Sequence, residues 1–220
     1  MKKILHRGLF LSLLFAFVFS LASPVPAQGQ TSDAQTDDQE EILSGTEGLF
    51  LEAHLQGHGV TVEDDDTDNG RGFGVKVGYG FTPLITAYLG IDGASMDVGD
   101  PGTRSLAANE YSLVYVDLGG RLNFRSGQNS VVPYLDASLS GIASTYSTSG
   151  GDVTFSGSGA SVGAGLQYFV SRQFALNGGL DLTFGSYDEV EAGSQTESVD
   201  LGFTGARIDV AVSWYPFQSD

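Results

Sequence analysis

The chain has 220 residues, of which 27 are acidic and 10 are basic, with 31 glycines and no cysteine. This length allows about one domain, and a hydrophobic content of 41% excludes a wholly disordered protein. The net charge of −17 argues against nucleic-acid binding, because phosphate recognition needs a basic face, and the lack of cysteine excludes a disulfide scaffold or a thiol nucleophile.

The first 27 residues have the pattern of a cleaved signal peptide. A basic start precedes an apolar run over residues 9–22, and Val25 and Ala27 are the small residues expected before a cut at Gln28. The alternative is a retained membrane anchor, but the apolar run is shorter than the roughly 20 residues needed to span a bilayer. We therefore expect residues 1–27 to be removed.

The remaining chain divides into three parts by composition. Residues 28–46 are polar and acidic and predict a flexible leader, residues 47–217 predict a β-barrel, and residues 218–220 form a short tail. Within the barrel region, apolar and polar residues alternate in eight runs, which is the pattern of β-strands. The runs lie at residues 49–58, 72–81, 85–92, 114–124, 133–141, 160–168, 174–184 and 199–214.

The connections between the runs alternate in length. Three are short, at residues 82–84, 125–130 and 171–173. Four are long and rich in acidic residues, at residues 60–71, 97–109, 144–157 and 186–198. This alternation is typical of an antiparallel up-and-down barrel whose two rims face different compartments.

The apolar face of each strand could point inward, as in a soluble barrel, or outward into lipid. We favour the outward direction, because glycines crowd the polar face, where a narrow barrel has room only for small side chains. Aromatic residues also gather near the short turns, as in an interfacial girdle. These predicted lipid-interface aromatics are Tyr79, Phe81, Phe124, Tyr168, Phe174 and Trp214.

Three segments carry a resemblance to a known group of proteins. They read GFGVKVGYGFT at 72–82, VPYLDASLSG at 132–141 and GARIDVAVSWYPF at 205–217. With the signal peptide and the eight amphipathic strands, they make residues 48–217 similar to the small eight-stranded outer-membrane β-barrels, the OmpA/OmpX-like and opacity-like proteins. The resemblance implies an outer-membrane location, contact with membrane lipid, recognition by the barrel-assembly machinery and a monomer. One departure is that Phe217 is followed by three polar residues instead of ending the chain.

One irregularity in the alternation predicts a β-bulge. Val199, Leu201 and Phe203 have a sequence parity opposite to that of Ile208 and its apolar neighbours. Keeping both apolar sets on one face requires one extra residue, so we predict a bulge near Gly205.

Charged residues on the inward face predict a polar plug that replaces an apolar core. An ion path is the alternative, but eight strands enclose little space beyond side chains. We expect each basic side chain to contact a carboxylate, because buried charges persist only when they are paired. The predicted lumen charge cluster contains Glu52, Lys76, Asp92, Asp117, Arg121, Asp136, Asp181, Arg207 and Asp209.

The histidines and the acidic loop give weak signals for a chemical site. His54 and His58, four residues apart on one strand, lie roughly 13 Å apart and cannot share a metal. Some outer-membrane barrels of this size modify lipid A with a His and a Ser at the rim, which makes His58 a candidate base near the outer rim. No Ser follows either histidine at a two-residue spacing, and a rim hydrogen bond is the preferred role of His58. The loop from Asp65 partly fits a calcium-binding loop, but its twelfth position is Lys76 instead of Glu. Loose divalent-cation binding stays open for Glu63, Asp64, Asp65, Asp66 and Asp68.

The sequence therefore predicts an all-β, eight-stranded transmembrane barrel without a cofactor or catalytic residues. Its expected function is a structural or surface-interaction role through four long acidic loops. The alternatives are a secreted or periplasmic soluble barrel that carries a hydrophobic ligand, and a barrel enzyme that modifies lipid A.

Overall fold

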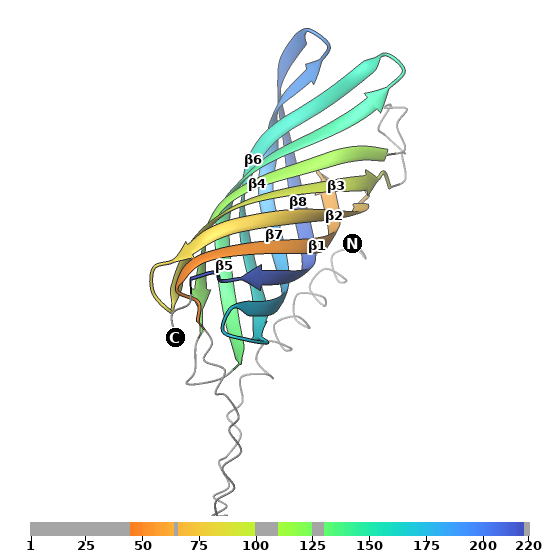
Figure 1. Ribbon diagram of the computed structural model, residues 1–220. Coiled ribbons are helices and arrows are strands. Elements are labelled where there is room, and N and C mark those ends of the chain that lie inside the picture. The colour runs from red at the N-terminus through yellow and green to blue at the C-terminus, as the bar shows by residue number, and fades with distance from the viewer. Residues whose placement is uncertain (1–44, 64–65, 100–109, 125–129, 218–220) are drawn as a thin grey trace, which may run out of the picture. The chain divides into compact units, whose positions relative to one another are not determined.

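Long strands form a single closed sheet in the computed structural model, which describes residues 45–63, 66–99, 110–124 and 130–217. Each strand pairs antiparallel with the next, and the last strand returns to pair with the first, as Figure 1 shows. The strands are β1 (Gly48–Val62), β2 (Asp68–Gly80), β3 (Ile85–Asp97), β4 (Glu110–Asn123), β5 (Val131–Thr148), β6 (Gly151–Phe169), β7 (Phe174–Ala192) and β8 (Gln195–Trp214). The predicted eight-stranded up-and-down barrel is confirmed.

The expected signal peptide and nearly all of the leader lie outside the described residues. Among the residues that the structure does describe, none belongs to a helix long and apolar enough to cross a membrane.

Apolar side chains cover the outer wall of the barrel, and charged side chains fill its interior. Leu55, Leu89 and Ile208 expose 65%, 51% and 64% of their surface, whereas Lys76 and Arg207 expose 7% and 4%. A soluble barrel has the opposite arrangement, because it gains stability by enclosing its apolar side chains. The structure therefore does not support the soluble, ligand-carrying alternative.

Short turns mark one end of the barrel. Phe81 N donates to Ile85 O at 2.9 Å between β2 and β3, and Val170 N donates to Phe174 O at 3.0 Å between β6 and β7. Thr82 and Ser171 hold these turns by accepting hydrogen bonds from backbone N–H groups through their hydroxyl oxygens. The six predicted interface aromatics are all exposed and lie beside this end of the barrel.

The other end carries two long hairpins. Strands β5 to β8 have 18 to 20 residues, compared with 13 to 15 in β1 to β4, and they extend well past their neighbours (Figure 1). The expectation of long loops at 144–157 and 186–198 is wrong, because both segments are hairpins with turns at 149–150 and 193–194. Their Ser- and Thr-rich sequences indicated loops, yet polar residues form strands readily when both faces are wet.

The outer parts of β5 to β8 form a sheet that rises beyond the closed barrel. Pairing of β4 with β5 stops at Ser112–Thr145, and pairing of β1 with β8 stops at Val62–Phe203, whereas β6 and β7 remain paired to their ends. We call residues 146–157 and 186–202 the projecting sheet.

The predicted bulge near Gly205 is wrong. The register of β8 against both neighbours passes through Gly205 without a shift, and the irregularities lie at Ser156/Gly157 and Tyr187/Glu189. No bulge is needed at Gly205, because Phe203 points inward and is buried. The parity of apolar residues changes in β8 because the interior itself becomes apolar at the outer end.

Candidate functional site

The barrel interior consists of a charged network between two apolar clusters. The turn-end cluster contains Phe50, Tyr88, Val132, Phe169, Ala175 and Tyr215. The outer cluster contains Val60, Met96, Tyr111, Leu113, Tyr115, Ile142, Tyr146, Tyr187 and Phe203. Because these side chains are nearly or fully buried, the charged groups between the clusters are shielded from water at both ends.

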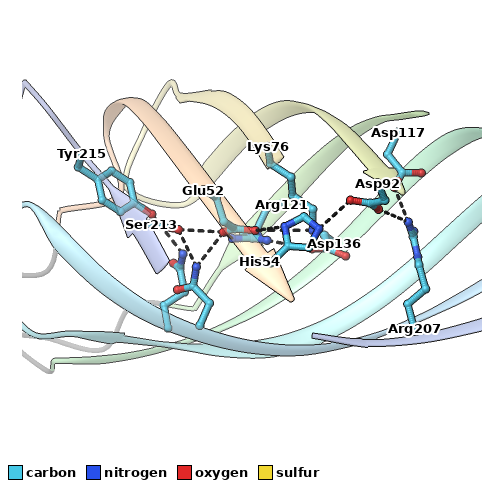
Figure 2. A network of polar contacts seen from close by, with 12 residues as sticks. Glu52, His54, Lys76, Asp92, Asp117, Arg121, Asp136, Arg207, Ser213 and Tyr215 are labelled. Carbon is cyan, nitrogen blue, oxygen red and sulfur yellow. Dashed lines mark hydrogen bonds and ion pairs between the residues drawn. The ribbon is translucent and has the colours of Figure 1, made fainter. Parts of the chain in front are cut away.

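The half of the network nearer the short turns is centred on the carboxylate of Glu52 in β1. Lys76 Nζ lies 3.7 Å from its Oε1, and Arg121 Nη1 lies 3.6 Å from its Oε2. The same Oε2 accepts hydrogen bonds from Ser213 Oγ at 2.8 Å and from Asn177 Nδ2 at 2.7 Å. These partners come from β2, β4, β7 and β8, so Glu52 links strands around the whole barrel (Figure 2).

The outer half of the network is centred on the guanidinium of Arg207 in β8. Its Nη1 donates to Asp92 Oδ2 at 2.8 Å and to Asp117 Oδ2 at 2.6 Å. His54 joins the halves, because its Nε2 lies 2.7 Å from Asp92 Oδ1 and its Nδ1 lies 3.9 Å from Glu52 Oε1. Figure 2 shows the resulting continuous line of polar contacts along the interior.

All nine residues of the predicted lumen charge cluster point into the barrel and are buried. Each of the three basic side chains lies within ion-pair distance of at least one carboxylate. Arg121 also lies over the Tyr134 ring at 3.9 Å, and Arg207 over the Tyr115 ring at 4.6 Å. Such stacking holds a guanidinium in place where water is scarce.

Inward-facing glycines make room for these side chains. A Cβ added to Gly165 would overlap the ring of Tyr134 and the carbonyl oxygen of Gly178. A Cβ added to Gly93, on the outer wall, would meet nothing within 4 Å. The packed interior therefore leaves no space for a larger side chain at inward-facing glycines such as Gly165.

We predict that Gly165→Ala destabilises the barrel by about 1–3 kcal/mol, the usual cost of overpacking a filled interior. Gly93→Ala is the matched control, because it makes the same change in a strand where the new methyl group has open space. The measurement is urea unfolding in detergent micelles, followed by the shift in gel mobility of the unheated protein. Equal midpoints for the two variants would contradict this description of the interior.

Neither of the two described histidines, His54 and His58, reaches the outer surface. His54 is part of the network, and the ring of His58 stacks on the ring of Tyr115, with 6.0 Å between their centroids. The expectation that His58 lies near the outer rim as an accessible base is therefore wrong, because its side chain is buried below the outer cluster. Its strand continues outward for four more residues before β1 ends at Val62.

The acidic segment after β1 does not gather into a metal site among the described residues. Asp68 points inward and accepts a hydrogen bond from Gly99 N at 2.8 Å, and Glu63 begins the turn with a positive φ of 51°. Asp64 and Asp65 lie outside the described residues.

Comparison with known proteins identifies the family. Residues 13–214 match the family described as outer membrane protein beta-barrel domain. The chain belongs to this family. It is an outer-membrane β-barrel protein, and its location is the outer membrane. A search of curated proteins finds no match.

Several solved outer-membrane barrels have the same fold. Neisserial surface protein A (NspA) is 16% identical, with a TM-score of 0.57, over 78% of this chain and 99% of that one. Ail, the attachment invasion locus protein of Yersinia pestis, is 15% identical, with a TM-score of 0.50, over 77% and 100%. OprG from Pseudomonas aeruginosa is 10% identical, with a TM-score of 0.52, over 79% and 98%. At these identities the likeness shows the fold alone.

Family membership sets the direction of the barrel in the membrane. Outer-membrane barrels have short periplasmic turns and longer extracellular connections. The short turns at 81–84 and 170–173 therefore face the periplasm, and the projecting sheet faces the outside of the cell.

The aromatic residues of the outer cluster are the main feature that sequence reasoning missed. Tyr111, Tyr115 and Tyr187 share the inward parity of their strands with charged residues, but the predicted runs at 114–124 and 174–184 include only Tyr115. The signal was present in the alternation itself, because Tyr111 and Tyr115 lie on the same face of β4 as Asp117.

Proposed function

We propose that this outer-membrane barrel is non-enzymatic and binds an extended, basic segment of a partner protein through the free edge of its projecting sheet. The observation that carries the proposal is the length of β8 beyond its pairing with β1. That pairing ends at Phe203, after which Glu63 N donates to Gly202 O at 2.8 Å. Among the described residues, no strand pairs with the same edge at 195–201.

An unpaired strand edge is a template for a further strand. Its backbone N–H and C=O groups are free to bind an extended peptide, and such edge addition is a common way of recognising peptides. Two copies of this edge would place Glu197 and Asp200 close to the same charges of the other copy. Like charges across a strand pair are destabilising, so a partner of opposite charge is favoured over a second copy.

The charge of the projecting sheet supports a basic partner. Its residues include six acidic side chains and no basic one, and all six are exposed. They are Asp152, Asp188, Glu189, Glu191, Glu197 and Asp200. Clustered charge of one sign increases the rate at which a partner of opposite sign associates. The names of NspA and Ail, a surface protein and an attachment protein, agree with a surface role.

The positions of the histidines and carboxylates support a non-enzymatic role. His54, His58 and the carboxylates of the network are enclosed in the interior, between the two apolar clusters. A lipid-modifying enzyme needs its base and nucleophile at the wall or the rim, where the substrate can reach them.

The test uses the full chain in lipid nanodiscs and an eight-residue peptide that alternates Lys and Val, labelled with a fluorophore. We expect saturable binding, measured by fluorescence polarisation, that weakens steeply as salt is raised. Glu197→Lys with Asp200→Lys should weaken binding at least tenfold, because it reverses the charge beside the free edge.

Two controls separate edge binding from general attraction. The paired changes Asp152→Lys and Glu191→Lys alter the net charge equally at positions away from the free edge, and they should weaken binding less than threefold. A peptide of the same charge with alternate Val replaced by Pro cannot pair as a strand, and it should not bind. Equal binding of the two peptides would overturn the proposal.

A further inference from the structure

The outer wall carries a recess with one basic side chain at its edge. The recess is shallow and open, has a volume of about 620 Å³ and lies over β1, β2 and β8 on the outward face of the barrel. Its apolar lining consists of Leu55, Phe73, Ile208 and Val210, and Arg71 lines it as well.

The recess exists because Gly57 has no side chain. Gly57 lies between Arg71 on β2 and Ile208 on β8 in the register of the sheet, with Leu55 one outward position nearer the periplasm. A Cβ at Gly57 would contact Ile208 Cγ2 at 3.4 Å, so a larger side chain there would occupy the recess. An apolar chain can therefore lie closer to the sheet at Gly57 than at the neighbouring outward positions, where side chains extend from the wall.

Arg71 lies where the apolar band of the wall ends. It is eight residues from Tyr79, which lies beside the periplasmic turns, and both side chains point outward. Eight residues at about 3.3 Å each, tilted about 40°, cover roughly 20 Å along the barrel axis, close to the height of the apolar band of such barrels at ≈ 25 Å. The outward neighbours of Arg71, Asn69 and Ser95, are polar. Arg71 is thus at the level of the headgroups of the outer leaflet.

Arg71 is unpaired among the described residues. It is exposed, and its guanidinium makes no hydrogen bond or ion pair with another residue in the part of the chain that the structure describes. By contrast, Lys76, Arg121 and Arg207 are all paired in the interior. An outward arginine at the edge of an apolar band is placed to bind an anionic group of the membrane, and a phosphate matches the fork of the guanidinium.

From these observations we propose that this face is a binding site for lipid A, the phosphorylated glycolipid of the outer leaflet. One acyl chain lies in the recess over Gly57, between Phe73 and Ile208, and a phosphate of the headgroup binds Arg71. A second recess of about 610 Å³ lies nearer the periplasm and includes Val75 and Trp214 in its lining. It has no outward basic residue, so it offers an acyl chain no comparable headgroup contact.

The test is native mass spectrometry of the protein in detergent micelles titrated with hexa-acyl lipid A or with phosphatidylglycerol. We expect lipid A to bind the wild-type chain at least tenfold more tightly than phosphatidylglycerol, with one tight site. Arg71→Gln should weaken lipid A binding at least fivefold, whereas Arg172→Gln, which removes the same charge at a periplasmic turn, should leave it within twofold.

A second pair of variants tests the recess separately from the charge. Gly57→Val fills the recess and leaves Arg71 in place, and it should weaken lipid A binding at least threefold. Gly141→Val makes the same change on the outward face of β5, away from the recess, and should have no effect. Gel mobility of the unheated protein confirms that each variant is folded.

Three results would overturn the inference. One is unchanged lipid A binding in Arg71→Gln and Gly57→Val. Another is an equal loss of binding in Arg71→Gln and Arg172→Gln, which would indicate a general effect of charge. The third is binding of phosphatidylglycerol as tight as that of lipid A, which would assign the recess to ordinary phospholipid.

Discussion

Arg207→Met is expected to lower the free energy of unfolding by about 3–5 kcal/mol, the typical cost of removing one partner from a buried ion pair. The substitution leaves Asp92 and Asp117, both buried, without the guanidinium that binds them. It also removes the contact between Arg207 and the Tyr115 ring. Urea unfolding in micelles, followed by gel mobility and tryptophan fluorescence, measures the change.

Two further variants show whether the loss comes from unpaired charge. Arg71→Met makes the same replacement on the outer wall and should change stability by no more than about 0.5 kcal/mol. Combining Arg207→Met with Asp92→Asn and Asp117→Asn should recover part of the loss, because the buried negative charges are removed as well. No recovery in the combined variant would mean that packing, and not charge, explains the effect of Arg207.

Leu89→Arg is expected to destabilise the barrel in lipid vesicles by about 2–4 kcal/mol, the cost of a basic side chain at the middle of the hydrocarbon region. Leu89 is exposed at the middle of β3, between the turn-end residue Ile85 and the outer residue Ser95. Equilibrium unfolding from vesicles in guanidinium chloride gives the difference from the wild-type chain.

Ser95→Arg, on the same face of the same strand, tests how the cost of an arginine depends on its depth in the membrane. Ser95 pairs with Arg71 in the sheet and lies at the same level, so this substitution should destabilise the barrel by only about 0–1 kcal/mol. If both substitutions had the same cost, Leu89 would not be in contact with acyl chains, and the assigned position of the barrel in the membrane would be wrong.

Most of the fold could be predicted from alternation, because each residue of a strand faces either lipid or the interior. Phe73, Val75 and Val77 fixed the outward face of β2, and Lys76 fixed its inward face. The same rule placed Glu52 and Arg207 in the interior, although their sequence separation gave no information on contact. Which carboxylate binds which arginine could not be predicted, since it depends on strand register and side-chain length together.

The errors at β8 and at the two hairpins have a common cause, which is that Val, Leu and Phe residues of the strands were expected only on the lipid face. That assumption is correct within the membrane but fails beyond it, where lipid is absent and the inner face of a strand can become apolar. Phe203 is the clearest case, because its sequence parity predicted a bulge, whereas its side chain simply points inward into the outer cluster. The hairpins were missed for a related reason, since neither face of the projecting sheet is consistently apolar.

The network of the interior also has a consequence for the order of folding. Its hydrogen bonds join residues far apart in the sequence, with separations of 115 for Arg207–Asp92, 125 for Asn177–Glu52 and 161 for Ser213–Glu52. Contacts this distant form late, because a long loop must first be ordered. Glu52 and Asp92 therefore lack their partners Ser213 and Arg207 until β8 pairs with β1. Completion of the network and pairing of the first strand with the last are then one event, which makes the β1–β8 seam the last part of the barrel to form.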